Sequence, residues 1–353
     1  MASSPAEIIT RIPTQFAKAK QDGDLFFYPS TVHSHTEIGI DFEIRLCPAL
    51  QKKPVLPTPQ FEVPPVVSST TEEKPVDPFM PPYNKGLYIG ELKDELEDKE
   101  YVVLLNKFAL VEGHALLISK KFESQSAPLS PGDLVMAYTL LRASRQQGRN
   151  IFAFYNCNDN SGASQPHKHL QFMPSPENDA PPIERVARSI RLESPDKPFT
   201  LASLPYAHYI FRLPPYLATQ PLKSISDLEK LETVLAGAYI TLLDLVISLL
   251  RHTDHESSSD AQTRGAAATR PSYNMIMTTE HIHMIPRLKE SYSLSTSGPA
   301  SDVNSLGFAG MLMVKSEEQL AHVKKESVAR ILTGVGCKPG EWDDMATGVV
   351  LDD

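Results

Sequence analysis

The sequence places six of its eleven histidines in the pattern H-x-H. On a β-strand, residues i and i+2 point to the same face about 6 to 7 Å apart, so such a pair directs two imidazoles into one space. A pair of this kind can supply a nucleophile with a helper, or two ligands of a metal ion. The three pairs are His33/His35 in VHSHTE, His167/His169 in PHKHLQFMP and His281/His283 in HIHMIP.

The second pair has the strongest surroundings for chemistry. His167, His169 and Gln171 form a polar series on one face of a predicted strand, while Lys168, Leu170 and Phe172 take the other face. The loop before it, CNDNSGASQ, contains Gly162 for a close backbone approach and the hydroxyls of Ser161 and Ser164. Such a loop can form a nest of backbone amides for phosphate oxygens. The combination predicts a phosphate-handling site, with an exposed strand face as the alternative.

The other two pairs lack these surroundings. We expect His281 and His283 to be structural or to lie at the rim of a site, because no glycine-rich loop precedes them. We expect His33 and His35 to lie in a solvated turn before the alternating strand IDFEIRL. A zinc site built from Cys157, His167 and His169 is a further alternative, but it lacks a clear fourth ligand.

Composition limits the class of partner. The 353 residues carry a net charge of −9, which argues against a nucleic-acid partner. Three cysteines without C-x-x-C spacing predict neither a disulfide framework nor a structural zinc motif, and indicate a reducing compartment: the cytoplasm, with the nucleus as an additional location. The apolar run 235–250 contains Asp244 and is read as a buried helix, so we expect no membrane partner.

An order of elements occurs twice along the chain. A helix begins at Ser130 and ends near Gln147, and strands follow at 151–156 and 167–173. A second helix begins at Ser226 and ends near Arg251, and strands follow at 273–278 and 281–285. This repeat predicts an α+β fold of two related halves with an antiparallel sheet and packed helices. The halves are 1–195, with a proline-rich excursion at 54–82, and 196–340, with a flexible loop at 254–271.

The segment NSGASQPHKHLQ resembles the active-site segment of the histidine triad superfamily, on the galactose-1-phosphate uridylyltransferase-like branch where glutamine replaces the third histidine. Further segments, among them FEIRLCPALQKKP, DPFMPPYNKGLYIGEL and YNMIMTTEHIHMIPR, are similar to the fungal diadenosine tetraphosphate phosphorylases, also called ATP adenylyltransferases. The resemblance runs from about residue 23 to residue 337. It implies a histidine-triad-like fold in which 1–195 is the catalytic half and 196–340 the ATP adenylyltransferase half.

The resemblance also implies an activity and a set of site residues. The activity is phosphorolysis of diadenosine tetraphosphate to ATP and ADP through a histidyl-AMP intermediate. His169 is implied as the nucleophile, Gln171 as the residue that holds the transferring phosphate, and His167 as the residue that orients the loop or protonates the leaving oxygen. Substrate contacts are implied at Lys53, Asn106, Lys107, Asn156, Gly162, Ala163, Ser164, Gln165, Asn274, Ile282 and Arg287. The family usually has tryptophan and methionine where this chain has His281 and Ile282, so this part of the site departs from the pattern.

The implied chemistry makes a structural demand. Neutral imidazole is nucleophilic near pH 7, and its second ring nitrogen should donate to a backbone carbonyl that fixes the tautomer. We expect a divalent cation such as Mg²⁺ to arrive with the nucleotide, and no tightly bound zinc. The competing functions are a dinucleoside polyphosphate hydrolase, a hexose-1-phosphate nucleotidylyltransferase and a non-catalytic nucleotide sensor.

Overall fold

The computed structural model describes residues 2–52, 77–257, 270–294, 300–340, 348 and 350–351. Its centre is an eight-stranded sheet in which every neighbouring pair of strands is antiparallel. The strand order is β11 (Tyr209–Arg212), β13 (His281–Pro286), β12 (Tyr273–Met277), β8 (Ile151–Cys157), β9 (His169–Pro174), β7 (Ala115–Ser119), β5 (Lys99–Leu105) and β4 (Tyr88–Asp94). Because β8 pairs with β12, strands of both predicted halves form one continuous sheet, and the α+β antiparallel fold is confirmed.

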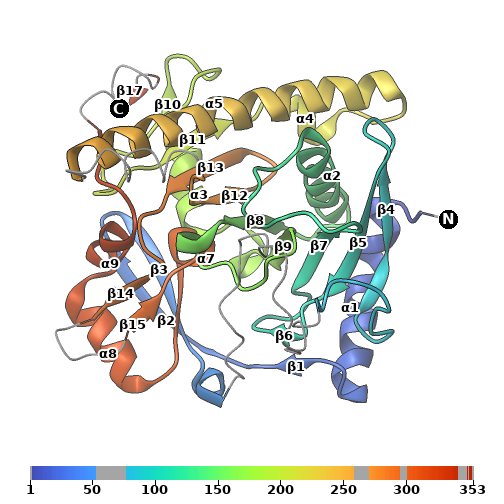
Figure 1. Cartoon of the computed structure of the whole chain (residues 1–353), viewed down its shortest axis with the longest axis horizontal. Coiled ribbons are helices and arrows are strands. Elements are labelled where there is room, and N and C mark those ends of the chain that lie inside the picture. The colour runs from blue at the N-terminus through green and yellow to red at the C-terminus, as the bar shows by residue number, and fades with distance from the viewer. Residues whose placement is uncertain are drawn as a thin grey trace, which may run out of the picture.

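Helices cover one face of this sheet (Figure 1). They are α1 (Pro5–Asp22), α2 (Pro131–Gln146) and α5 (Ile225–Ser257), with the short α4 (Tyr216–Thr219) leading into α5. The first, third and fifth side chains of β8 and of β12 point toward these helices, because successive side chains of a strand lie on opposite faces of the sheet. Leu170, Phe172 and Cys157 belong to the same apolar cluster as the buried side chains of the three helices.

A second layer covers the opposite face. It contains a three-stranded sheet of β2 (Thr31–Glu37), β3 (Ile40–Leu46) and β16 (Met311–Val314), and the helices α3 (Pro182–Ser189), α7 (Ser305–Phe308), α8 (Glu317–Glu326) and α9 (Val328–Val335). Two-stranded ladders and single turns complete the described chain: β1 (Phe26–Phe27) with β6 (Phe108–Ala109), β10 (Arg191–Leu192) with β17 (Val350–Leu351), β14 (Ser291–Ser293) with β15 (Ala300–Asp302), and η1 (Pro48–Lys52), η2 (Asp159–Ser161) and η3 (Pro176–Asn178).

Two predicted boundaries need correction. His33 and His35 do not lie in a solvated turn, because VHSHTE is strand β2, paired over its whole length with β3. The second long helix begins at Ile225, one residue before Ser226, and Ser224 precedes it as the cap: Ser224 and Asp227 bond to each other's backbone amides as a capping pair. By contrast, Ser130 caps α2 as predicted, with Asp133 completing the capping box.

The predicted loop and excursion fall mostly outside the described residues. Of the predicted flexible loop 254–271, residues 254–257 continue α5 and 258–269 are not described. Of the proline-rich excursion 54–82, residues 54–76 are not described, while 77–82 lead toward β4 through a turn. The prediction of two halves with a boundary near residue 195 stays a prediction.

Helix α5 is more exposed than the sequence indicated. Within the described residues, Ile225–Thr253 is long and apolar enough to cross a membrane by length and composition alone. In the fold, Leu231, Leu235, Leu242 and Val246 pack into the helix-covered core, while Ile240 is 62% exposed. The helix therefore packs through one face, as an amphipathic surface helix does.

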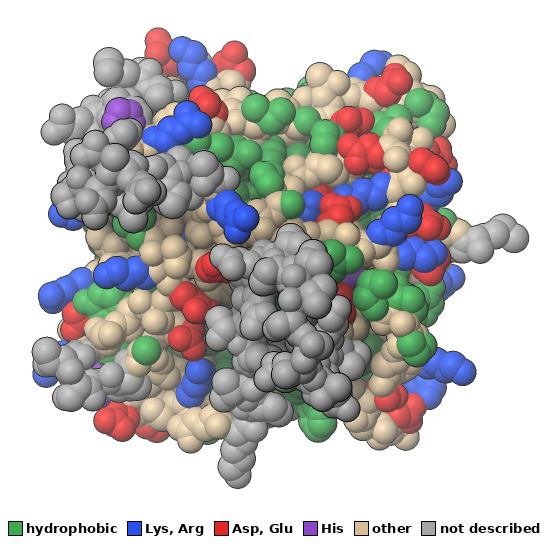
Figure 2. All heavy atoms as spheres, in the orientation of Figure 1, with side chains coloured by type: hydrophobic (Ala, Val, Ile, Leu, Met, Phe, Trp, Pro, Cys, Tyr) green, Lys and Arg blue, Asp and Glu red, His purple; other side chains and the backbone are tan. Residues whose placement is uncertain are grey.

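Charges of both signs are interspersed on the face shown in Figure 2. Acidic and basic side chains alternate across the described part of this surface, and they do not gather into a broad basic patch there. This distribution agrees with the net charge of −9.

A buried charge cluster joins α2 to the sheet beneath it. Asp133, 1% exposed, accepts bonds from Lys99 at 2.7 Å, Tyr101 at 2.9 Å and Lys168 at 3.3 Å. Burial raises the pKa of Asp133, but the charges of Lys168 and Lys99 outweigh it and hold the pKa below its ordinary value. Glu123 bonds the same two lysines, each at 2.7 Å. Lys168 is thereby fixed on the face opposite His169.

Substitution Asp133→Ala should lower the free energy of unfolding by about 3 to 5 kcal/mol, because it leaves two buried ammonium groups to share one carboxylate. Urea unfolding followed by circular dichroism measures the change. Asp98→Ala is the matched control, because Asp98 pairs with Lys93 at the surface with 84% of its side chain exposed. Equal unfolding curves for the two variants would contradict a stabilising role of the cluster.

Candidate active site

His169 lies at the start of β9 with its tautomer fixed. It is 3% exposed, and its Nδ1–H donates to the carbonyl of His167 at 2.8 Å. The carbonyl accepts only, so Nδ1 carries the proton and Nε2 keeps its lone pair. Burial lowers the pKa of His169 to about 4, so the ring is neutral near pH 7. The bond to a backbone carbonyl predicted from the sequence is confirmed.

The strands separate beside His169, and a glutamine side chain fills the gap. The paired residues of β8 and β9 end at Phe154 and Gln171, so Asn156 and His169 do not bond directly. Gln125 bridges them: its Oε1 accepts from the His169 amide at 2.8 Å, and its Nε2 donates to the Asn156 carbonyl at 2.8 Å. Gln125 is fully buried, so the bridge holds the start of β9 in place.

His167 is held at both ring nitrogens. Its Nε2 lies 2.7 Å from the Ser119 carbonyl and its Nδ1 lies 2.8 Å from Asp77 Oδ2. Because the ring is fully buried and bonded on both sides, the arrangement supports the orienting role of His167 over protonation of the leaving oxygen. The rings of Phe79 and Phe122 pack against it with centroids 6.0 and 5.3 Å away.

Gln171 shares the face of His169 and joins a second polar group. Its Oε1 lies 3.0 Å from His114 Nε2, and Asn106 Nδ2 lies 3.3 Å from the same nitrogen. The structure thus brings the predicted residues Asn106 and Gln171 together through His114, which the sequence did not single out. In the tautomer with the proton on His114 Nε2, Oε1 of Gln171 accepts from it, and the amide nitrogen of Gln171 is the group left to donate to a ligand.

Three predicted contacts form a buried network behind the loop that contains Gly162. Asn274 Nδ2 donates to Asn156 Oδ1 and to the Ser161 carbonyl, both at 2.9 Å. Arg287 donates to Asn274 Oδ1 and to Val303 O, the latter at 2.8 Å. Asn156, Asn274 and Arg287 are each at most 2% exposed. The network fixes the loop, while direct contact of these three side chains with substrate stays a prediction.

The loop itself depends on Gly162. Its φ of +77° lies in the left-handed region, and a Cβ there would come within 2.9 Å of Val303 O. Ala163 is buried, Gln165 is partly exposed and Ser164 is exposed. Ser161 does not offer its hydroxyl to a phosphate as expected, because it is fully buried and donates to Asn158 O at 2.6 Å.

The remaining predicted contacts differ in outcome. Ile282 as a substrate contact is wrong: it is fully buried in the core between the sheet and the helices, on the face opposite His169. Lys107 is exposed, with its Nζ 5.9 Å from the centroid of the Phe26 ring. Lys53 lies outside the described residues.

The zinc alternative at Cys157, His167 and His169 fails on geometry. Cys157 belongs to the helix-side core and lies 3.6 Å from Ser126 O, whereas His169 points to the opposite face of the sheet. Burial also raises the pKa of the Cys157 thiol to about 12, which disfavours the thiolate that zinc requires.

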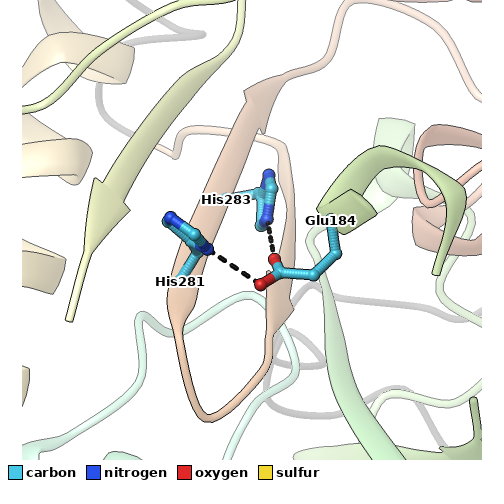
Figure 3. A group of neighbouring side chains, drawn as sticks. All are labelled: Glu184, His281 and His283. Carbon is cyan, nitrogen blue, oxygen red and sulfur yellow. Dashed lines mark hydrogen bonds and ion pairs between the residues drawn. The ribbon is translucent and has the colours of Figure 1, made fainter. Parts of the chain in front are cut away.

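A second histidine group lies on the active-site face of the sheet. Figure 3 shows His281 and His283 of β13 pointing from one strand to the carboxylate of Glu184 on α3. The distances are 2.8 Å from His281 Nδ1 to Oε1 and 2.7 Å from His283 Nε2 to Oε2. Burial raises the pKa of Glu184, but the bonds and charges of the two histidines outweigh it and lower the pKa to about 2.

These three residues have the types that bind zinc or iron, but their neighbours favour a hydrogen-bonded cluster. Arg212 Nε donates to His281 Nε2 at 3.0 Å, which requires the proton on Nδ1, the nitrogen that faces Glu184. A metal on Nδ1 would require the opposite tautomer, with two donors facing each other. Arg188 adds a second positive charge 3.8 Å from Glu184. The pair is therefore structural, as the sequence analysis expected.

A cavity of about 410 Å³ lies on the helix-covered face, between α1 and the sheet. Its lining is mostly apolar and includes Ile8, Phe16 and Phe172. It does not contain His169, and its walls offer few groups for a polyphosphate. The cavity therefore does not fit a polyphosphate, and His169 stays the candidate for the chemistry.

Comparison with known proteins identifies the family. The model of the Ap4A phosphorylase N-terminal domain matches residues 1–189, and that of the ATP adenylyltransferase C-terminal domain matches residues 202–338. Two similar proteins of Saccharomyces cerevisiae are diadenosine tetraphosphate phosphorylase 2, 29% identical over 76% of this chain and 78% of its own, and Protein APA1, 27% identical over 97% and 99%. The crystal structure of yeast Ap4A phosphorylase Apa2 superposes with a TM-score of 0.72 at 25% identity, covering 97% of each chain. The first model covers 189 of the 353 residues, so this chain belongs to the Ap4A phosphorylase family.

Proposed function

We propose that this protein catalyses the phosphorolysis of diadenosine tetraphosphate (Ap4A) to ATP and ADP, as a nucleotidyltransferase. The observation that carries the proposal is the neutral imidazole of His169, whose Nδ1–H donates to the His167 carbonyl so that Nε2 keeps its lone pair. A dinucleoside polyphosphate hydrolase or a hexose-1-phosphate nucleotidylyltransferase would use the same nucleophile, so the acceptor distinguishes these activities.

In the first step, Nε2 of His169 attacks the α-phosphorus of one adenosine end. A nitrogen–phosphorus bond forms, the bond to the bridging oxygen breaks, and ATP leaves with that oxygen. The ring then carries a positive charge and retains its Nδ1–H. The His167 carbonyl, 2.8 Å from Nδ1, stabilises this cation without a proton transfer.

In the second step, an oxygen of inorganic phosphate attacks the histidyl-AMP. The nitrogen–phosphorus bond breaks, ADP leaves, and His169 returns to its neutral form. Water can attack the same intermediate, so phosphate must be favoured by binding and orientation, which contribute about 7 to 11 kcal/mol in well-aligned reactions. The donors we assign to this task are the amide nitrogen of Gln171, the exposed hydroxyl of Ser164, and Lys53 and Lys107.

The remaining expectations are part of the same proposal. A divalent cation such as Mg²⁺ accompanies the polyphosphate as part of the substrate. The partners are small nucleotides and phosphate, without a nucleic acid or a membrane. The three cysteines are buried as thiols, which supports a reducing compartment, the cytoplasm with or without the nucleus. Microscopy of a tagged full-length chain tests the location, and staining confined to the secretory pathway would contradict it.

The direct test of function is incubation with Ap4A, with and without phosphate, and chromatography of the products. With phosphate we expect equal amounts of ATP and ADP; without it, one AMP per active site should stay on the protein through an acid-labile bond. His169→Ala should remove the label and lower turnover at least about a thousandfold. Near-normal turnover by His169→Ala would exclude His169 as the nucleophile.

Substitution Gln171→His should raise the share of AMP relative to ADP among the products. Histidine at 171 loses the amide donor for phosphate and adds a titratable group beside the intermediate, which helps water to attack. Product ratios at saturating phosphate measure the change, with Gln146→His on the exposed end of α2 as the control. An unchanged ratio in Gln171→His would show that Gln171 does not select the acceptor.

We also propose that the protein holds no tightly bound zinc. Elemental analysis of the purified chain should find far less than one zinc per chain, and prolonged chelation should leave it folded, because Arg212 and Arg188 supply the positive charge beside Glu184. Stoichiometric zinc that is lost in Glu184→Gln would overturn this reading of the cluster.

A further inference from the structure

Asp77 contacts two groups that surround the nucleophile. Its Oδ2 lies 2.8 Å from Nδ1 of His167, and its Oδ1 accepts from the Phe79 amide at 2.9 Å. The second bond closes a turn that places the Phe79 ring over His169, with centroids 5.1 Å apart. Asp77 is therefore connected to His169 through two neighbouring residues: the backbone of His167 and the ring of Phe79.

The hydrogen bonds of His167 define its protonation. The Ser119 carbonyl only accepts, so Nε2 carries a proton. The Asp77 carboxylate also only accepts when ionised, so Nδ1 carries the second proton. His167 is then a buried imidazolium paired with Asp77, whose side chain keeps 24% of its surface exposed. A fully buried charged ring is stable only while its partner stays in place.

This ion pair fixes the geometry at the nucleophile. With both ring nitrogens bonded, the His167 ring cannot rotate, and its backbone carbonyl stays directed at His169 Nδ1, 2.8 Å away. Phe79, 9% exposed, packs against the His169 ring at an interplanar angle of 59°. Without the carboxylate, His167 loses the bond at its Nδ1, and the turn that holds Phe79 loses the bond from the Phe79 amide.

We propose that Asp77 is a positioning residue for the nucleophile: it holds His167 as an imidazolium and Phe79 over His169, and so keeps Nε2 of His169 directed at the phosphorus. The inference rests on the proposed function for its kinetic consequence, but the Asp77–His167 ion pair is testable without substrate. Asp77 itself does not contact His169 and takes no part in bond making.

The test compares Asp77→Asn and Asp77→Glu with wild type and with the surface control Asp98→Asn. In rapid-quench reactions with Ap4A and no phosphate, Asp77→Asn should form the histidyl-AMP on the order of 10²-fold more slowly, because a displacement of about 1 Å costs this much. KM should change much less than the labelling rate, and Asp77→Glu, which keeps the charge, should recover part of the rate. The control should label at the wild-type rate.

A spectroscopic measurement distinguishes failure of this inference from failure of the proposed function. Nitrogen-15 NMR of histidine-labelled protein, with signals assigned by His167→Gln, should show both ring nitrogens of His167 protonated at pH 7 in wild type and one unprotonated in Asp77→Asn. A neutral His167 in wild type, or wild-type labelling by Asp77→Asn, would overturn the inference. If wild type forms no label while His167 shows the predicted change, the ion pair holds and the proposed function fails.

Discussion

The pairing of β8 with β12 in the middle of the eight-stranded sheet is the constraint on which the rest of the structure depends. Its register sets Asn156 directly opposite Asn274, and their side chains bond at 2.9 Å. From this pair the network continues to Arg287, Ser161 and Ser305, which fixes the loop that precedes the nucleophile. A shift of β12 by one residue would turn Asn274 into the apolar core and leave Arg287 without its partner.

The two faces of the continuous sheet carry different kinds of side chain. One face packs against α1, α2 and α5 through Leu170, Phe172 and Ile282. The other face carries His169, Gln171, His281 and His283 on alternate residues of β9 and β13. The two histidine pairs share this face but have different neighbours. His169 bonds to the His167 carbonyl through Nδ1, so its Nε2 keeps the lone pair. His281, by contrast, bonds to Glu184 through Nδ1 and to Arg212 through Nε2. The different partners agree with the catalytic role proposed for His169 and with a structural role of His281 and His283.

The sequence predicts features that depend on neighbours along the chain. The Ser130 cap, the two strand pairs and the common face of His169 and Gln171 follow from local spacing, and the structure has them, whereas His167 lies before the first residue of β9. The sequence does not predict features that depend on contacts between segments far apart in the chain. His33 and His35 form a strand because β3 is available to pair with them, and Ile282 is buried because α5 crosses its face of the sheet. Asp77 contacts His167 from 90 residues away in the sequence, and Gln125 contacts His169 from 44 residues away. Local spacing does not predict such contacts.

The central claim is a reaction in two displacements at one phosphorus atom, first by His169 and then by phosphate. Each in-line displacement inverts the configuration at phosphorus, so two of them restore it. The most direct measurement uses an Ap4A analogue with one sulfur at a chiral α-phosphorus and determines the configuration of the ADP analogue formed by phosphorolysis. A histidyl-AMP intermediate predicts retention. Inversion would mean that phosphate attacks the substrate directly, and it would contradict a histidyl-AMP intermediate.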